Sequence, residues 1–119
     1  MQHLSLENFS IHVTGEGSSF GMKWKGKSEF RNPSEILNPY LDETLGEIGN
    51  GSSLTVDFTE LDFMNSSTFP AILHFMKKCS QMKLETKFQY KGSSEWQAAS
   101  FKPIQTIGAK LSGISFESK

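Results

Sequence analysis

Three hydroxyl residues stand in a row, Ser66-Ser67-Thr68, within the stretch FMNSSTFP that covers residues 63–70. The strand-like segment LTVDFTELDF ends at this stretch, and the helix-like segment TFPAILHFMKKC begins within it. Ser, Thr and Asn are common helix caps because a side-chain oxygen accepts a hydrogen bond from a free backbone N–H of the first turn. The simplest interpretation is therefore a helix cap. The alternative is a hydroxyl that is displayed for covalent modification.

Other nucleophilic and metal-binding residue types form no constellation with catalytic spacing. Cys79 falls on the apolar stripe of the helix-like segment, where a free cysteine behaves as a small hydrophobe, so we expect it in the core. His74 has no cysteine or carboxylate at a pairing interval within the helix, and His3 and His12 have no metal-ligand spacing to a neighbour. We therefore predict no metal site and no nucleophilic catalysis.

Acidic residues and glycines also give no catalytic pattern. Asp57, Glu60 and Asp62 cluster around the end of the strand-like segment, but no base or metal ligand accompanies them. Neither glycine pattern of phosphate-binding loops, G-x-x-x-x-G-K-[ST] or G-x-G-x-x-G, occurs in the chain. A nucleotide-binding or GTP-hydrolysing domain is therefore the last of our hypotheses, and we expect neither an enzyme nor a cofactor.

Charge limits the remaining partner classes. The chain has 119 residues and a formal net charge of −1, and its basic residues are scattered, so nothing favours nucleic acid. Trp24 stands between two lysines, an arrangement that can bind single strands. In a neutral domain we interpret such a tryptophan, and Trp96 with it, as a core or interface residue.

Signals for export or membrane insertion are also missing from the sequence. No segment approaches the ~20 apolar residues of a membrane-spanning helix, and the start, MQHLSLENFS, lacks the pattern of a secretory signal. The single cysteine excludes an intramolecular disulfide and fits a reducing compartment. We therefore expect a cytoplasmic protein that does not insert into a membrane.

The elements that hold the hydroxyl residues follow from hydrophobic periodicity. Alternation of apolar and polar residues predicts two strands within residues 8–30. Asn32 and Pro33 form a helix start, and apolar residues then recur at helical spacing until Gly49. Pro39 leaves two alternatives, because the helix either kinks there or begins only at residues 38–39.

The middle of the chain contains the clearest strand, residues 54–58, which continues loosely to Phe63. Residues 84–90 also alternate, and their polar face suits an exposed side or a sheet edge. The helix between these strands carries an apolar stripe, formed by Phe69, Ile72, Leu73, Met76 and Cys79.

The C-terminal third predicts one more helix and one more strand. Ser94 and Gln97 have the spacing of a capping box, and the helix that they begin should end before Pro103. Ile114 and Phe116 mark a short last strand.

The order of the predicted elements is strand, strand, helix, strand, helix, strand, helix, strand. Strands that alternate with helices imply parallel pairs joined by crossover helices. We therefore predict a single α/β (or α+β) domain over residues 1–119, with a mixed sheet of four or five strands and about three helices.

At this point the run SLTVDFTELDFMNSSTFPAILHFMKKC resembles the central segment of STAS domains, the fold of bacterial anti-sigma factor antagonists. In that family a strand of the type hhhDhs, where h is apolar, leads through hxFhDSSG into a helix. The matching positions are Asp57 at the strand aspartate, Phe63 and Met64 at the apolar pair, Asn65 at the signature aspartate, Ser66 and Ser67 at the two hydroxyl residues, and Thr68 at the glycine. The segment MKWKGKSEFRNPSEI resembles the family's second strand and its run into the first helix, and the element order agrees over most of the chain.

The resemblance implies a phosphorylation switch in signal transduction. In the family, a partner serine kinase that doubles as the anti-sigma factor phosphorylates the serine after the aspartate, and a PP2C-type phosphatase reverses the mark. The unphosphorylated domain binds the kinase and frees the sigma factor. This partner switching regulates transcription. By position, Ser66 is the phosphoacceptor in this chain, with Ser67 and Thr68 as fallback acceptors.

A phosphate at a helix start need not unfold the domain, because free N–H groups and the helix dipole favour an anion there. Its effect should fall on the partner instead. We expect the partner-binding surface to combine the acceptor loop with the exposed side of the helix that follows it, namely Met64, Asn65, Ser66, Ser67, His74, Lys77 and Lys78.

The sequence departs from the family pattern at three positions. Asn65 keeps a capping side chain but removes the aspartate charge, and Thr68 replaces the glycine. Pro70 favours a helix start at Ser66 or Ser67, and a cap at Ser67 would leave Ser66 the freer hydroxyl. The missing aspartate supports an alternative function, a non-phosphorylated STAS-like scaffold or subunit of a transport or lipid-handling complex.

Overall fold

The computed structural model describes residues 2–119 as one six-stranded sheet and three helices. The strands are β1 (Leu4–Leu6), β2 (Phe9–Glu16), β3 (Ser19–Ser28), β4 (Ser53–Met64), β5 (Glu85–Tyr90) and β6 (Ile114–Ser118). The helices are α1 (Pro33–Ile48), α2 (Thr68–Gln81) and α3 (Glu95–Gly108). This architecture confirms the predicted fold class of a mixed sheet with crossover helices.

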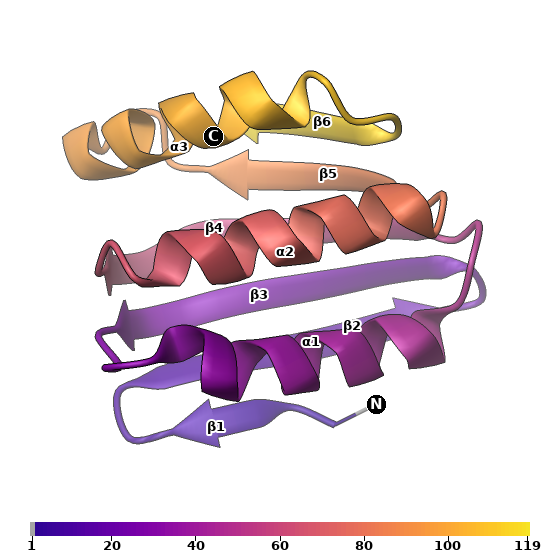
Figure 1. Ribbon diagram of the computed structural model, residues 1–119, viewed down its shortest axis with the longest axis horizontal. Helices are drawn as coiled ribbons and strands as arrows, with labels where there is room; N and C mark the ends of the chain where they lie inside the picture. Colours follow the sequence, from indigo (N-terminus) through magenta and orange to yellow (C-terminus); the bar gives the residue numbers. More distant parts are fainter. Residues whose placement is uncertain (1) are drawn as a thin grey trace.

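The strands lie in the sheet in chain order, from β1 to β6. The pairs β1–β2 and β2–β3 are antiparallel, and the three following pairs are parallel. All three crossovers step in the same direction across the sheet, so right-handed connections place α1, α2 and α3 on one face (Figure 1). The other face of the sheet carries none of the three helices described for residues 2–119.

The strand count exceeds the expected four or five because β1 was not predicted. This strand has only three residues and pairs with β2 from Leu4↔Ile11 to Leu6↔Phe9. A segment of three residues is too short for a period-2 pattern to identify. Its position at the edge of the sheet follows from its pairing with β2, which the sequence of β1 alone does not indicate.

Helix α1 begins at Pro33 and ends before Gly49, which has a φ of 81° that suits glycine. Of the two starts that Pro39 left open, the earlier one is therefore correct, and the helix passes through Pro39. Leu37 and Leu41 on either side of this proline are fully buried. Their packing compensates for the backbone hydrogen bond that proline cannot donate.

Helix α3 differs from the prediction at both ends. Ser94 makes no side-chain capping bond, so the expected capping box does not form, and Gln97 is buried inside the fold. The helix also continues through Pro103 to Gly108. Phe101 and Ile104 flank the proline and are fully buried, so tertiary packing overrides the local stop signal.

Strand β5 lies between β4 and β6, so it is an internal strand and not a sheet edge. Its buried residues, Thr86 and Phe88, alternate with side chains that point to the helix-free face. Of the two explanations for the polar face of this strand, a sheet edge is therefore wrong, and an exposed side of the sheet is correct.

One hydrophobic core fills the space between the sheet and the helices. Trp24 and Phe58 lie at its centre, with ring centroids 4.9 Å apart, and Phe101 of α3 lies 4.9 Å from Phe58. Cys79 is fully buried, as predicted, and burial raises the pKa of its thiol to about 12. Within residues 2–119, none of the helices is long and apolar enough to cross a membrane.

Candidate functional site

The candidate site begins where β4 extends beyond its neighbour. Pairing of β4 with β5 ends at Asp57↔Gln89, whereas pairing with β3 continues to Ser28↔Met64. Two irregularities in the β3–β4 register accompany this extension. The last part of β4 therefore carries the chain away from β5 and delivers it to the N-terminal end of α2 (Figure 1).

The buried side chain of Gln97 takes the place of the missing β5 partner. Its amide Nε2 donates to the carbonyl oxygens of Phe58 at 2.8 Å and Leu61 at 2.9 Å. Its Oε1 accepts the backbone N–H of Lys91 at 2.7 Å. Buried backbone groups need such partners, so α3 stabilises the end of β4 through one side chain.

Asn65, and not Ser67, caps α2. The Asn65 Oδ1 atom accepts the backbone N–H of Thr68 at 3.1 Å and the Thr68 hydroxyl at 2.8 Å. Ser67 makes no side-chain capping bond. The first turn is tight, because the N–H of Phe69 is bonded to the Ser66 carbonyl at 3.3 Å. This turn suits Pro70, which has no N–H to offer that carbonyl.

A set of hydrogen bonds, which we call the Asn65 staple, joins this junction to the end of β3 and to the segment that follows it. The Asn65 backbone N–H donates to the Ser28 carbonyl at 2.9 Å, and Asn65 Nδ2 donates to the Phe30 carbonyl at 2.8 Å. The hydroxyls of Ser28 and Thr68 lie 2.7 Å apart. Because the Thr68 proton goes to Asn65, the Ser28 hydroxyl is the donor in that contact.

The three hydroxyl residues differ sharply in accessibility. Ser66 and Ser67 are exposed, and neither hydroxyl takes part in the side-chain hydrogen bonds described for residues 2–119. Thr68 is fully buried, and its hydroxyl contacts both Asn65 and Ser28. A kinase could not reach Thr68 without opening the staple, so this residue does not fit its expected role as a fallback acceptor.

The residues expected on the partner-binding surface differ in their exposure. Met64 is 8% exposed and belongs to the core, which corrects its assignment to that surface. His74 and Lys77 are exposed and Lys78 is half-buried. Asp42 of α1 lies 3.1 Å from His74 Nε2 and 3.6 Å from Lys78 Nζ, so both side chains already contact a carboxylate of this chain.

Phe63 is an exposed apolar residue that sequence reasoning did not place on the surface. It is 44% exposed, stands two positions before Asn65, and pairs with Lys27 of β3. The preceding shift in the β3–β4 register breaks the alternation by which its direction could have been predicted. An exposed hydrophobic side chain therefore stands three and four positions before the two exposed serines in the sequence.

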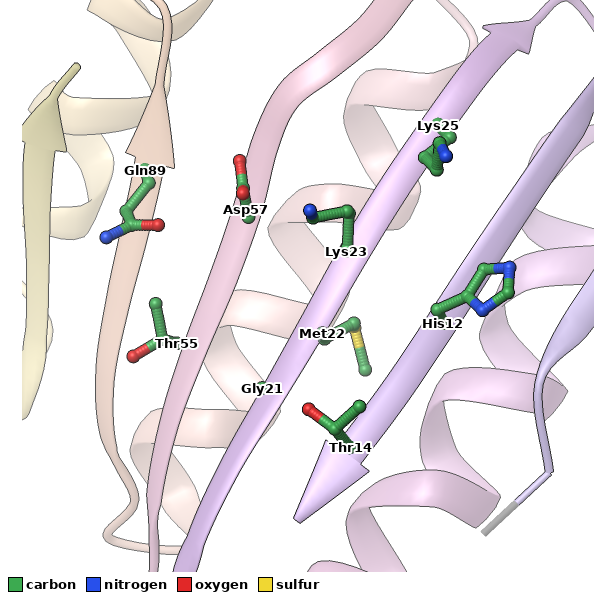
Figure 2. A pocket seen from close by; sticks show the side chains of 9 residues that line it. All are labelled: His12, Thr14, Gly21, Met22, Lys23, Lys25, Thr55, Asp57 and Gln89. Atoms are coloured by element: carbon green, nitrogen blue, oxygen red, sulfur yellow. The ribbon is translucent and has the colours of Figure 1, made fainter.

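A separate hollow lies on the helix-free face of the sheet (Figure 2). Its volume is about 450 Å³, and its lining includes Lys23, Lys25 and Asp57. The two ammonium groups lie 2.8 Å and 3.6 Å from Glu60, whose hydrogen bond raises the pKa of Lys23. Thr59 donates two hydrogen bonds to Asp57. The charged groups of the hollow are therefore already paired.

Within residues 2–119 there is no group of three or more His, Cys, Asp or Glu side chains that could hold a metal ion. His3 and His12 do meet, with ring centroids 4.7 Å apart, but His3 Nδ1 accepts the backbone N–H of Val13. The pair thus belongs to the attachment of the N-terminal segment.

Comparison with known proteins gives a clear result for the fold and none for the sequence. No family model matches the chain, and no curated protein matches it. An anti-sigma factor antagonist from Mycobacterium paratuberculosis superposes with a TM-score of 0.65 at 8% identity, over 92% of this chain and 86% of that one. The chain has an anti-sigma factor antagonist fold.

Two further structures support this assignment of the fold. A chain from the complex of the diguanylate cyclase SiaD with its activator SiaC, from Pseudomonas aeruginosa, has a TM-score of 0.64 at 15% identity. The match covers 98% of this chain and all of that one. An uncharacterised DUF3478-family protein with a SpoIIAA-like fold, from Shewanella loihica, has a TM-score of 0.57 at 18% identity, over 98% and 90% of the two chains.

The SpoIIAA-like fold places the Asn65–Thr68 segment at a strand–helix junction, and the staple explains why asparagine suits this chain. Asn65 accepts through Oδ1 and donates through Nδ2. An ionised aspartate could accept but could not donate to Phe30. The asparagine that replaces the signature aspartate therefore has a hydrogen-bond partner that an aspartate could not use, the Phe30 carbonyl.

Proposed function

We propose that this protein is a regulatory protein of the SpoIIAA-like fold that binds a partner under the control of reversible phosphorylation at Ser66. It performs no catalysis of its own. The observation that carries the proposal is the contrast at the junction. The Ser66 hydroxyl is exposed and takes part in none of the side-chain hydrogen bonds among residues 2–119, while Asn65 and Thr68 are held in the staple. A rigid frame thus presents a free hydroxyl.

Ser66 is preferred over Ser67 because the sequence resemblance assigns the acceptor position to the residue directly after Asn65. A phosphate at Ser66 adds about −1.5 to −2 charge next to the first turn of α2. That turn contains no acidic side chain, so the helix end tolerates the anion. The fold should persist, and the change should fall on partner affinity.

Two classes of partner are consistent with the fold. The anti-sigma factor antagonists suggest a serine kinase that acts as an anti-sigma factor, together with a PP2C-type phosphatase. The SiaD–SiaC complex suggests a second class, because there an activator binds a diguanylate cyclase. Both classes are cytoplasmic signalling proteins in our proposal, and neither requires a cofactor or a metal in this chain.

The experiment is phosphopeptide mapping of the protein isolated from its own cells, with and without phosphatase treatment. Phosphate on Ser66 that the phosphatase removes is the expected result, and Ser66→Ala should abolish it. Ser67→Ala is the matched control, because that exposed hydroxyl lies one residue away and should leave the mark intact. A bare Ser66 under growth and stress conditions would reject regulation at this position.

The second candidate function is a constitutive scaffold or subunit in a transport or lipid-handling complex. The missing signature aspartate favours it, since Asn65 has a structural role in the staple whether or not Ser66 is modified. Affinity purification separates the two functions. A scaffold should retain the same partners in the unmodified chain and in a chain that carries phosphoserine at position 66, whereas a switch should lose one.

A further inference from the structure

The staple joins the two backbone segments that carry Arg31 and the proposed phosphorylation site. Asn65 Nδ2 and the Phe30 carbonyl oxygen are 2.8 Å apart. Arg31 follows Phe30 and Ser66 follows Asn65, so each lies one residue from this bond. Two segments 35 positions apart in the sequence therefore run past each other at this point.

The charges around this contact leave the guanidinium group of Arg31 available. Arg31 is exposed, and among residues 2–119 it belongs to none of the ion pairs, which use lysines and His74. Glu29 and Glu35 are the nearest carboxylates along the same segment, and both are exposed to solvent. Solvated carboxylates compete only weakly for a guanidinium group.

We infer that Arg31 binds the phosphate of phosphorylated Ser66 within the same chain. This inference rests on the proposed function. A guanidinium group donates two parallel N–H bonds to phosphate oxygens, which is stronger and more directional than the contact of an ammonium group. Phosphorylation then links the β3–α1 segment to the start of α2 and occupies a cation that the unmodified chain presents to a partner.

The test uses a chain in which phosphoserine is incorporated at position 66 during translation, so that no kinase is needed. Phosphorus NMR then measures the second pKa of the phosphate, which is about 6 without a partner. We expect that pKa to be lower in the otherwise native chain than in Arg31→Gln, by about one unit, which is a tenfold change in proton affinity. Arg31→Lys should give a smaller shift, because it keeps the charge and loses the fork.

Two controls make the result specific. Lys27→Gln removes an exposed cation from β3 that the staple does not hold, and it should leave the phosphate pKa unchanged. Asn65→Ala opens the staple and should raise the phosphate pKa toward the Arg31→Gln value, with circular dichroism to verify that the chain is folded. Equal pKa values in the native, Arg31→Gln and Lys27→Gln chains would overturn the inference.

The outcome is independent of whether cells phosphorylate the protein. A bare Ser66 in the mapping experiment would reject the proposed regulation but would not alter the measured phosphate pKa. Conversely, phosphate found on Ser66 in cells together with no effect of Arg31→Gln would support the proposed function and reject the role of Arg31.

Discussion

The side-chain amide of Asn65 donates a hydrogen bond to the main-chain carbonyl of Phe30, 35 positions earlier in the chain, at 2.8 Å. Through its other atom, Oδ1, the same side chain caps α2. One residue thus fixes the start of a helix and attaches it to the neighbouring segment. The two contacts use different atoms of the side-chain amide, so substitutions can remove one contact and keep the other.

Asn65→Asp should destabilise the protein even though aspartate is a good helix cap. The carboxylate can still accept from Thr68, but its other oxygen meets the Phe30 carbonyl as a second acceptor. We expect a loss of about 1–3 kcal/mol in the free energy of unfolding, measured by urea denaturation. Asn65→Ala, which removes both contacts, should cost more. An Asn65→Asp protein as stable as the native one would show that the Phe30 bond contributes nothing.

Thr68→Val should destabilise the protein, and Ser66→Ala should not. Valine preserves the shape of threonine but leaves Ser28 and Asn65 without the buried hydroxyl that both contact. We expect Thr68→Val to cost about 1–3 kcal/mol. Ser66 is exposed and its hydroxyl has no hydrogen-bond partner in the part of the chain that the structure describes, so its substitution should change the free energy of unfolding by less than about 0.5 kcal/mol. Equal effects would contradict the assignment of Thr68 to structure and Ser66 to function.

Gln97→Leu should strongly destabilise the protein, although it changes the volume of the side chain only slightly. The leucine removes three hydrogen bonds to the backbone of Phe58, Leu61 and Lys91. Buried carbonyls without a partner carry a desolvation penalty, so we expect a cost of at least about 2 kcal/mol in chemical denaturation. Gln105→Ala on the same helix is the control, because Gln105 is only partly buried and its side chain makes no hydrogen bond among residues 2–119. If Gln97→Leu lowered the free energy of unfolding by less than the control does, the hydrogen bonds of Gln97 would not stabilise the end of β4.

Cys79 should make stability fall at high pH. Burial raises the pKa of its thiol from 9.0 to about 12, so between these values the unfolded chain loses the proton and the folded chain keeps it. The contribution to stability is therefore complete below pH ~9 and is lost as pH rises toward ~12, by up to ~1.4 kcal/mol per pH unit.

The matched comparison for this effect is Cys79→Ala, because other groups also titrate in that range. The variant should lose stability less steeply with pH than the native protein in urea denaturation series. In addition, a thiol reagent at pH 8 should react with the native chain only as it unfolds. Rapid labelling of the folded protein would contradict the burial of the thiol.

The sequence by itself determined the elements whose signals are local. Pro33 and Gly49 bound α1 because a proline suits the first helical position and a glycine suits a positive φ after the last one. The alternation in β2, β3 and β5 and the helical stripe of α2 predicted which faces are buried. The same patterns, with the resemblance of residues 53–79 to STAS domains, led to the correct fold and to a strand–helix junction at Asn65.

Only the tertiary structure decided which atoms meet at that junction. The partners of Asn65 and Gln97 lie more than 30 positions away, and a hydrogen bond over such a separation leaves no periodic trace in the sequence. The same is true of Thr68, whose type resembles that of its two neighbours although it alone is buried. Periodicity reports the direction of a side chain within its own element, whereas long-range packing determines what that side chain contacts. For this reason the three hydroxyl residues were found in the sequence, but the structure separated the structural threonine from the exposed serines.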